Sequence, residues 1–464
     1  MDVFLDFPLE VTRMIVVEWV HPIDLVFLDT AYCNHEKREP WEEVLRLATH
    51  FANYSMPDPN LFALYQNWVF AREVPTTRLR LGKSVDSDSF DGYLQNLGQF
   101  VEEVTFQELD EDDFGVLAAL VEKYCDNITQ LACTSCELEA TLMTMMNYKS
   151  TLRHLRITDC TDIQPDHNDL ASWEGSNHMQ LLSAQLECAD SMWFVESFLK
   201  LVDPTIIQQF SIRVDHAVPQ ALLVSFFPFC YNLLALGFSG SSDFDDAYFN
   251  SVAPFCSNVL HLDISYCTQL TDDIADELVE GMTQLRTLNI SGTVLTDVFI
   301  NVLAAHYSHS LQALHASDCA DLDEGYDVFG NSPALRILEC SCQDIVSTNV
   351  LISITTLILS DDFPNSLAEA FELVVSYGDL ENLRIVSNED DVFELDFMAL
   401  TAEALPRLHT LSVCVFAEVG KYDFDLEEPE RLRELRAARP YIHVYFNTDE
   451  LAYDQFKLPL HYDP

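Results

Sequence analysis

Apolar residues recur along most of the chain in the pattern L-x-x-L-x-L, in which any apolar residue can fill a place marked L. The copy at residues 259–264 returns at residues 285–290, and five consecutive spacings between copies are 26 residues. Such regular spacing is not expected by chance and indicates a repeat architecture. A further strand near Leu79 is predicted out of phase with the others. The first apolar residues of the copies are Val101, Ile128, Leu152, Leu181, Ile207, Leu233, Val259, Leu285, Leu311, Leu335, Ile354, Leu380 and Leu408.

Each copy predicts one short strand whose three apolar residues point inward. A polar loop and then an amphipathic helical stretch follow, for example at residues 272–282 and 297–307. One such unit cannot bury its apolar side alone, whereas stacked units share a continuous core. The pattern therefore predicts an α/β solenoid of about 13 repeats, shaped as a horseshoe with parallel strands on its concave side and helices on its convex side. Alternation at residues 441–446 predicts a last strand.

The cysteines follow the same register. Counting the first apolar residue of a copy as position 0, four cysteines occupy position 8, where the chain leaves the strand: Cys136, Cys160, Cys267 and Cys319. Three others precede position 0 by three residues, and Cys133 and Cys340 occupy the third apolar place. We therefore expect reduced, buried packing residues. Cys133 and Cys136 alone do not make a zinc site, because no second pair or suitably spaced histidine completes the set.

The stretch from Cys256 to Leu278 resembles the cysteine-containing class of leucine-rich repeats. The resemblance covers roughly residues 76–446, and it implies the same horseshoe solenoid. The residues that carry it most closely are Cys256, Val259, Leu262, Ile264, Cys267, Leu270, Thr271 and Asp272. Thr271 and Thr296 also make sense as helix starts on chemical grounds alone, because their side-chain oxygens can accept hydrogen bonds from the first free N–H groups.

The first fifty residues do not repeat. Helical spacing of apolar residues ends at Pro22, and three short helices fit the segment. The segment resembles an F-box, which implies binding to the Skp-type adaptor of a cullin-RING ubiquitin ligase. A cap derived from an F-box, and an unrelated cap over the first repeat, stay open as alternatives. The residues that the resemblance assigns to adaptor binding are Phe7, Pro8, Glu10, Val11, Ile15, Asp24, Leu25 and Leu28.

These patterns divide the chain into four predicted parts. Residues 1–50 form the all-α F-box-like module, and residues 51–100 form a connecting or capping region. Residues 101–446 form the solenoid, and residues 447–464 form a C-terminal cap or tail.

The charge of the chain limits its partners. There are 24 Lys and Arg residues against 76 Asp and Glu residues, so the formal net charge is −52. A surface this negative repels nucleic-acid phosphate and anionic lipid, so we expect neither nucleic acid nor membrane as a partner. The N-terminus lacks the basic start of a signal peptide, which predicts a soluble intracellular protein in the cytoplasm or nucleus.

Positions 2, 4 and 6 of each copy are predicted to line the concave face. Few acids fall there, and most acids instead gather where the chain leaves each strand for the helix, as in the runs at residues 108–113, 243–246, 321–327 and 423–430. These runs suit helix caps, but they also suit a rim that attracts a basic partner. The concave-face residues expected to contact a partner are His154, Arg156, Arg213, His261, Asp263, Asn289, His315, Glu339 and Arg384.

No catalytic or metal-binding constellation is predicted from the sequence, and no cofactor is expected. Two functions remain. In the first, the protein is the substrate-recognition subunit of a cullin-RING ubiquitin ligase, with an adaptor and cullin at one end and a protein client on the solenoid, for which a basic surface is one option. In the second, it is an acidic leucine-rich-repeat scaffold or inhibitor of a basic protein and has no ligase role.

Overall fold

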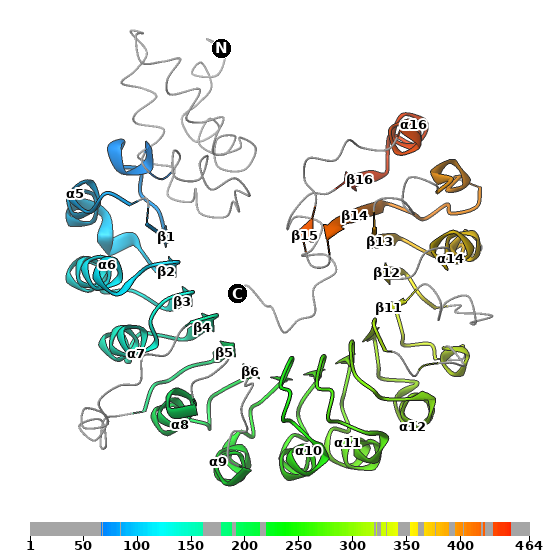
Figure 1. Ribbon diagram of the computed structural model, residues 1–464, viewed down its shortest axis with the longest axis horizontal. Coiled ribbons are helices and arrows are strands. Elements are labelled where there is room, and N and C mark those ends of the chain that lie inside the picture. The colour runs from blue at the N-terminus through cyan, green and yellow to red at the C-terminus, as the bar shows by residue number, and fades with distance from the viewer. Residues whose placement is uncertain are drawn as a thin grey trace. The chain divides into compact units, whose positions relative to one another are not determined.

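In the computed structural model, the described residues fall into two compact units that divide between Asp203 and Pro204. In each unit a parallel sheet is flanked by helices on one side (Figure 1). The described residues are 66, 68–83, 85–160, 178–187, 192–213, 220–319, 322, 326–330, 332–341, 353–360, 366–375, 377–388, 395–401, 403–418, 421–422 and 430–446.

The first unit alternates strands and helices along a parallel sheet with the order β1-β2-β3-β4-β5. Neighbouring strands pair without a register break, and β4 pairs with β5 from His154↔Ser183 to Thr158↔Glu187. The elements are β1 (Arg78–Leu81), α5 (Ser87–Leu97), β2 (Glu103–Gln107), α6 (Glu111–Tyr124), β3 (Gln130–Thr134), α7 (Leu138–Asn147), β4 (His154–Thr158), β5 (Ser183–Glu187) and α8 (Met192–Leu201).

The second unit continues the same alternation from β6 to β14. Strand β16 pairs in parallel with the first half of β14, and β15 pairs antiparallel with its end. The strands are β6 (Gln209–Arg213), β7 (Ala235–Gly237), β8 (His261–Asp263), β9 (Thr287–Asn289), β10 (Ala313–Ala316), β11 (Ile337–Ser341), β12 (Thr356–Ser360), β13 (Asn382–Asn388), β14 (Thr410–Glu418), β15 (Lys421–Tyr422) and β16 (His443–Phe446). The helices are α9 (Gln220–Phe226), α10 (Asp246–Val252), α11 (Ala275–Gly281), α12 (Asp297–Tyr307), α14 (Ser366–Val374) and α16 (Glu430–Ala438).

The sequence register is confirmed strand by strand. Every strand from β2 to β14 begins two residues after the first apolar residue of its copy. The side chains of Val259, Leu262 and Ile264 are fully buried, so positions 0, 3 and 5 form the core between sheet and helices. Burying each such side chain stabilises the fold by about 1.5–3 kcal/mol. Both units are therefore leucine-rich-repeat solenoids.

One strand was predicted in the wrong phase. Strand β1 pairs with β2 from Arg78↔Glu103 to Leu81↔Phe106, so it belongs to the repeat register. Its position 0 is Thr76, a buried polar residue whose hydroxyl donates to the carbonyl of Arg78 at 2.8 Å. The search for an apolar residue at that place therefore missed this copy.

In seven of the described copies, a left-handed backbone residue follows the strand at position 7. Tyr266 has φ 57°, Gly292 has φ 67° and Asp318 has φ 58°. The N–H of Tyr266 donates to the carbonyl of Ser291 at 2.7 Å, and that of Gly292 donates to Ser317 at 2.8 Å. The left-handed residue thus adds one more backbone hydrogen bond between neighbouring copies, just beyond the end of the strand. Glu108, Ser135 and Asp159 do the same in the first unit.

Position 8 thiols satisfy backbone groups of the preceding copy. The Sγ of Cys267 donates to the carbonyl of Phe238 at 3.0 Å, and that of Cys319 to the carbonyl of Ile290 at 3.2 Å. Cys230 and Cys256 instead donate to carbonyls four residues earlier, at the ends of short helical turns. Ten cysteines lie in the described residues, and all ten are buried. The predicted burial is confirmed for these ten.

We expect thiol labelling of the native protein to be slow at these ten cysteines. Burial raises the pKa of Cys125, Cys230 and Cys267 to about 12, so little reactive thiolate forms at neutral pH. The chain has 13 cysteines, so at most 13 − 10 = 3 should react within minutes. Mass spectrometry after a brief pulse of a maleimide reagent measures this. Rapid modification of Cys267 or Cys256 without denaturant would contradict it.

Gly281 provides a second test, because α11 ends close against the turn that precedes Phe255. A Cβ at Gly281 would lie 2.4 Å from the carbonyl oxygen of Ala253, whereas a Cβ at Gly115 in α6 would meet nothing within 4 Å. We expect Gly281→Ala to lower the free energy of unfolding by about 1–3 kcal/mol through overpacking. The control Gly115→Ala should raise it by up to about 1 kcal/mol through helix propensity. Urea unfolding measures both, and shifts of the same sign would be inconsistent with this packing.

Candidate functional site

Side chains at position 4 form one continuous row along the sheet of the second unit. Pairing places Asp263 beside Asn289, Asn289 beside His315, and His315 beside Glu339. The row continues through Ile358 to Arg384 and Ser412. These side chains stand on the face of the sheet that points away from the helices, which we call the sheet face. The position 4 residues of this unit therefore share one face of the sheet.

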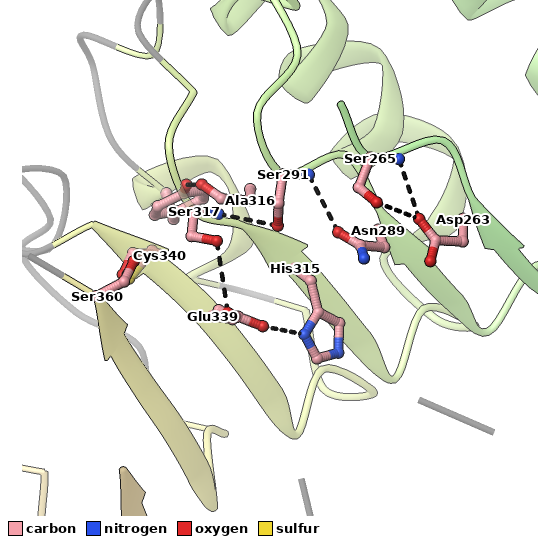
Figure 2. A network of polar contacts seen from close by, with 11 residues as sticks. Asp263, Ser265, Asn289, Ser291, His315, Ala316, Ser317, Glu339, Cys340 and Ser360 are labelled. Atoms are coloured by element: carbon pink, nitrogen blue, oxygen red, sulfur yellow. Dashed lines mark hydrogen bonds and ion pairs between the residues drawn. The ribbon is translucent and has the colours of Figure 1, made fainter. Parts of the chain in front are cut away.

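The row is cross-linked to the serines at position 6, as Figure 2 shows. Asp263 Oδ1 accepts from the backbone N–H of Ser265 at 3.0 Å and from its hydroxyl at 2.6 Å. Asn289 Oδ1 likewise accepts from the N–H of Ser291 at 3.0 Å. An Asp or Asn side chain that accepts from the backbone two residues later fixes its own rotamer. The polar groups of the row are therefore held in place before any partner arrives.

Neighbouring serines also connect one strand to the next. The hydroxyls of Ser239 and Ser265 lie 2.8 Å apart, and the N–H of Ser317 donates to the hydroxyl of Ser291 at 3.2 Å. Ser317 in turn donates its hydroxyl to Glu339 Oε1 at 3.4 Å. None of these serines was among the residues predicted to contact a partner. The repeated serine at position 6 in adjacent copies was the signal that could have indicated a ladder.

His315 and Glu339 form a hydrogen-bonded pair at the centre of the row. Nδ1 of His315 lies 2.5 Å from Oε2 of Glu339, and the His315 side chain is only 4% exposed. Burial raises the pKa of Glu339, but the hydrogen bond and charge of His315, the charge of Arg384 and the hydroxyl of Ser317 outweigh burial and hold that pKa below its usual range. Glu339 therefore remains a carboxylate at neutral pH.

The predicted histidines of position 2 lie one row away. Nδ1 of His261 lies 3.0 Å from the hydroxyl of Thr287 on the next strand. Burial, followed by the charge of Arg286, lowers the pKa of His261 to about 4. Burial, followed by the charge of Arg153, also lowers the pKa of His154. Both side chains are half-buried, and at neutral pH they present uncharged rings to a partner.

The face of the first unit carries its own charged side chains. Arg156 is exposed on β4, and Arg78 Nε lies 2.8 Å from Glu103 Oε2 across β1 and β2. Arg80 Nε also donates to Gln107 Oε1 at 2.5 Å. The sequence analysis missed both arginines of β1, because that strand was placed out of phase.

The remaining predicted residues differ in accessibility. Arg213 is exposed, and Asp263, Asn289 and Glu339 are half-buried. Arg384, like His315, is buried with 4% exposure, so a partner cannot reach its guanidinium without rearrangement. Both residues therefore belong to the packed part of the sheet face, where His315 holds Glu339 through their hydrogen bond. Contact with a partner remains a prediction for all nine residues.

Acids at the helix starts are used by the fold where the structure describes them. Asp110 Oδ1 accepts from the N–H of Asp113 at 3.0 Å at the start of α6, and Asp245 Oδ1 accepts from that of Tyr248 at 3.0 Å at the start of α10. Such caps satisfy N–H groups that the helix leaves free. At these positions the acidic side chain has a structural role as a helix cap.

A second kind of contact joins adjacent copies, and we call it the Asp–Thr clasp. Asp246 accepts from the N–H of Thr271 at 2.8 Å and from its hydroxyl at 2.6 Å. Asp272 accepts in the same way from Thr296, at 2.8 and 2.5 Å. The two threonines also cap their own helical turns, as predicted. The repeated Thr-Asp sequence thus links three successive copies.

The described part of the chain contains no group of three or more His, Cys, Asp or Glu residues arranged to hold a metal ion. None of its helices is long and apolar enough to cross a membrane. The predicted adaptor-binding residues, from Phe7 to Leu28, lie outside the described residues. Most of the acidic runs at 321–327 and 423–430 lie outside them as well.

We expect the low pKa of His261 to make the fold sensitive to mild acid. Between pH 6.5 and 4 the unfolded chain binds a proton at this histidine that the folded chain does not bind, so stability falls as pH falls through that range. Between pH 7 and pH 5 the free energy of unfolding should fall in both proteins. For the variant His261→Asn the fall should be smaller than for the parent, by on the order of 1–2 kcal/mol. Paired urea titrations at the two pH values measure the difference. Parallel losses in parent and variant would contradict it.

Comparisons with known proteins leave the family unassigned. No protein-family model and no curated protein matches the chain. Among solved structures, Rad7 from the yeast Rad7–Elc1 complex shows 13% identity and a TM-score of 0.44 over 91% of this chain and 96% of that one. An internalin from Listeria monocytogenes has 14% identity and a TM-score of 0.37, and the match covers 78% of this chain and 96% of the internalin. A Bacteroides fragilis protein has 16% identity and a TM-score of 0.34, and the match covers 53% of this chain and 67% of that protein. Likenesses at these TM-scores carry no argument, and the fold assignment rests on the repeat register.

Proposed function

We propose that this chain is a non-enzymatic substrate-recognition subunit of a cullin-RING ubiquitin ligase. Its sheet face binds a protein client, and residues 1–50 bind a Skp-type adaptor that joins it to the cullin. Such a protein works in the cytoplasm or nucleus, where ligase and client meet. The adaptor role rests on the sequence resemblance of residues 1–50 to an F-box, and the client role rests on the position 4 row.

The row of Asp263, Asn289, His315 and Glu339 is the observation that carries client binding. The repeat fold requires apolar side chains at positions 0, 3 and 5, but it sets no residue type at position 4. Four adjacent copies nevertheless place four different polar side chains there, and each of the four is bonded to a neighbouring serine or to another member of the row. Fixed, chemically distinct groups in a line are suited to recognising one partner surface.

The alternative is an acidic scaffold or inhibitor that binds a basic protein through the helix-start acids and has no ligase role. Asp246 and Asp272 weigh against it, because their carboxylates are already used by the clasps. The two functions differ in their dependence on salt. Binding through exposed acids weakens steeply as salt rises, because exposed charges are screened beyond about 10 Å at 0.1 M.

We expect the double variant Pro8→Ala, Ile15→Asp to lose the adaptor while it keeps the melting temperature of the parent. An adaptor-binding module must expose apolar side chains, and Ile15→Asp places a charge among them. Repeat units contact mainly their neighbours, so such a change leaves the solenoid intact. Co-purification with a Skp-type adaptor and cullin, run beside a thermal melt, measures both properties.

Val298→Asp is the matched control, because Val298 is 61% exposed on α12 and its substitution adds the same charge. This variant should keep both the adaptor and the melting temperature. A cap behaves in the opposite way, because Ile15→Asp then buries a charge and destabilises the protein by several kcal/mol. A lowered melting temperature, with no adaptor bound even by the parent, would rule out the ligase role and leave the scaffold.

A further inference from the structure

Two adjacent copies of the second unit expose aromatic side chains in the turns that lead from helix to strand. Phe229 is 55% exposed, Tyr231 is 57% exposed, and Phe255 is 40% exposed. Leu234, the residue before β7, is 40% exposed. We call these four residues the aromatic patch. It lies outside the position 4 row, and neither the repeat core nor the proposed client site uses it.

The patch arises from a repeated local sequence. Pro228-Phe229-Cys230 returns 26 residues later as Pro254-Phe255-Cys256, so each phenylalanine takes the same place in its copy. At the corresponding place the next copies have Gly281 and the buried Tyr307. Within the described part of the second unit, the tandem exposed phenylalanines are thus confined to these two copies.

The backbone beneath the patch is fixed by hydrogen bonds. The Asn258 side-chain amide donates to the carbonyl of Tyr231 at 2.8 Å, which ties one turn to the other. The thiols of Cys230 and Cys256 donate to carbonyls four residues earlier, at 3.5 and 3.4 Å. Large apolar side chains on a rigid backbone lose little entropy on binding, and residues of this kind contribute most of the affinity of protein interfaces.

Acidic residues predominate in the sequence around the patch. Residues 220–285 contain nine Asp and Glu residues and no Lys or Arg, although Arg286, the first residue after this range, is exposed. One of these acids, Glu280, is exposed at the end of α11, next to Gly281. The backbone at Gly281 packs against Ala253, two residues before Phe255, so Glu280 lies at the end of the helix that packs beside the turn of Phe255.

We propose that the aromatic patch docks a protein segment that combines aliphatic side chains with lysine or arginine. The aliphatic groups cover Phe229, Tyr231 and Phe255, and the cations meet Glu280 and the surrounding negative field. A contact between two copies of this chain is disfavoured, because each carries a formal charge of −52 and the patch has no cation to offer. Anionic lipid and nucleic acid are disfavoured for the same reason.

The test uses fluorescein-labelled synthetic peptides of one length and one amphipathic pattern, made from Leu and Lys, from Leu and Glu, or from Ser and Lys. We expect the Leu/Lys peptide to bind the full chain most tightly. Phe229→Ser with Phe255→Ser should weaken that binding at least tenfold, and Glu280→Lys should weaken it about threefold. The control Val116→Ser with Val298→Ser removes equally exposed side chains from α6 and α12 and should change it less than twofold.

Folding and location are checked independently of affinity. The four phenylalanine and valine sites are exposed, so both double variants should keep the melting temperature of the parent. If the phenylalanine double variant melts lower, Tyr231→Ser replaces it. Hydrogen exchange on the unaltered protein needs no variant, and the Leu/Lys peptide should slow exchange within residues 226–234 and 252–260.

Three results would overturn the proposal. The first is unchanged Leu/Lys binding by the phenylalanine double variant, with no slowing of exchange at the patch, since the peptide is then held by charge elsewhere. The second is binding of the Leu/Glu peptide as tightly as the Leu/Lys peptide, because the patch then does not select a positively charged partner. The third is a dimer in 0.5 M salt that the phenylalanine double variant abolishes, which makes the patch a contact between copies.

Discussion

The structure depends on hydrogen bonds that, in most of the described copies, pass from one copy to the next just after the strand ends. At position 7 the chain turns left-handed, and its N–H reaches a carbonyl of the following copy, as Tyr266 reaches Ser291 at 2.7 Å. A left-handed residue other than glycine costs about 1–2 kcal/mol, and a backbone hydrogen bond returns about 0.5–1.5 kcal/mol. The position 8 side chain and the Asp–Thr clasps follow from where this turn directs the chain. Each copy is therefore stable only beside its neighbours.

Spacing alone predicted the strands, because burial forces apolar residues into positions 0, 3 and 5 and a 26-residue period repeats them. The exception at Thr76 shows the limit, since a buried threonine that bonds to its own backbone fills an apolar place. The left-handed turn was not predictable from residue type, because Glu108, Tyr266 and Asp318 adopt it as Gly292 does. At this position the hydrogen bonds to the next copy determine the backbone conformation, whatever conformation the residue itself prefers.

The candidate site was predictable in outline and not in detail. Successive side chains of a strand point to opposite faces of the sheet, so residues at even positions share one face. This rule predicted one face for Asp263, Asn289, His315 and Glu339. It could not reveal that His315 and Arg384 are buried or that serines brace the row, since those facts depend on lateral packing across copies. The acidic residues fall into two groups by their contacts. Some accept hydrogen bonds in helix caps and Asp–Thr clasps, whereas others, such as Glu280, are exposed near the aromatic patch.

Residue-resolved hydrogen exchange of the native protein tests the cross-copy ladder most directly. If position 7 amides complete the sheet, those of Ser135, Tyr266 and Gly292 should exchange as slowly as the strand amides beside them, although they lie outside the strands. They should also lose protection together with those strands as denaturant is added. Exchange of these three amides at the rate of open loops, while the neighbouring strands stay protected, would contradict the account.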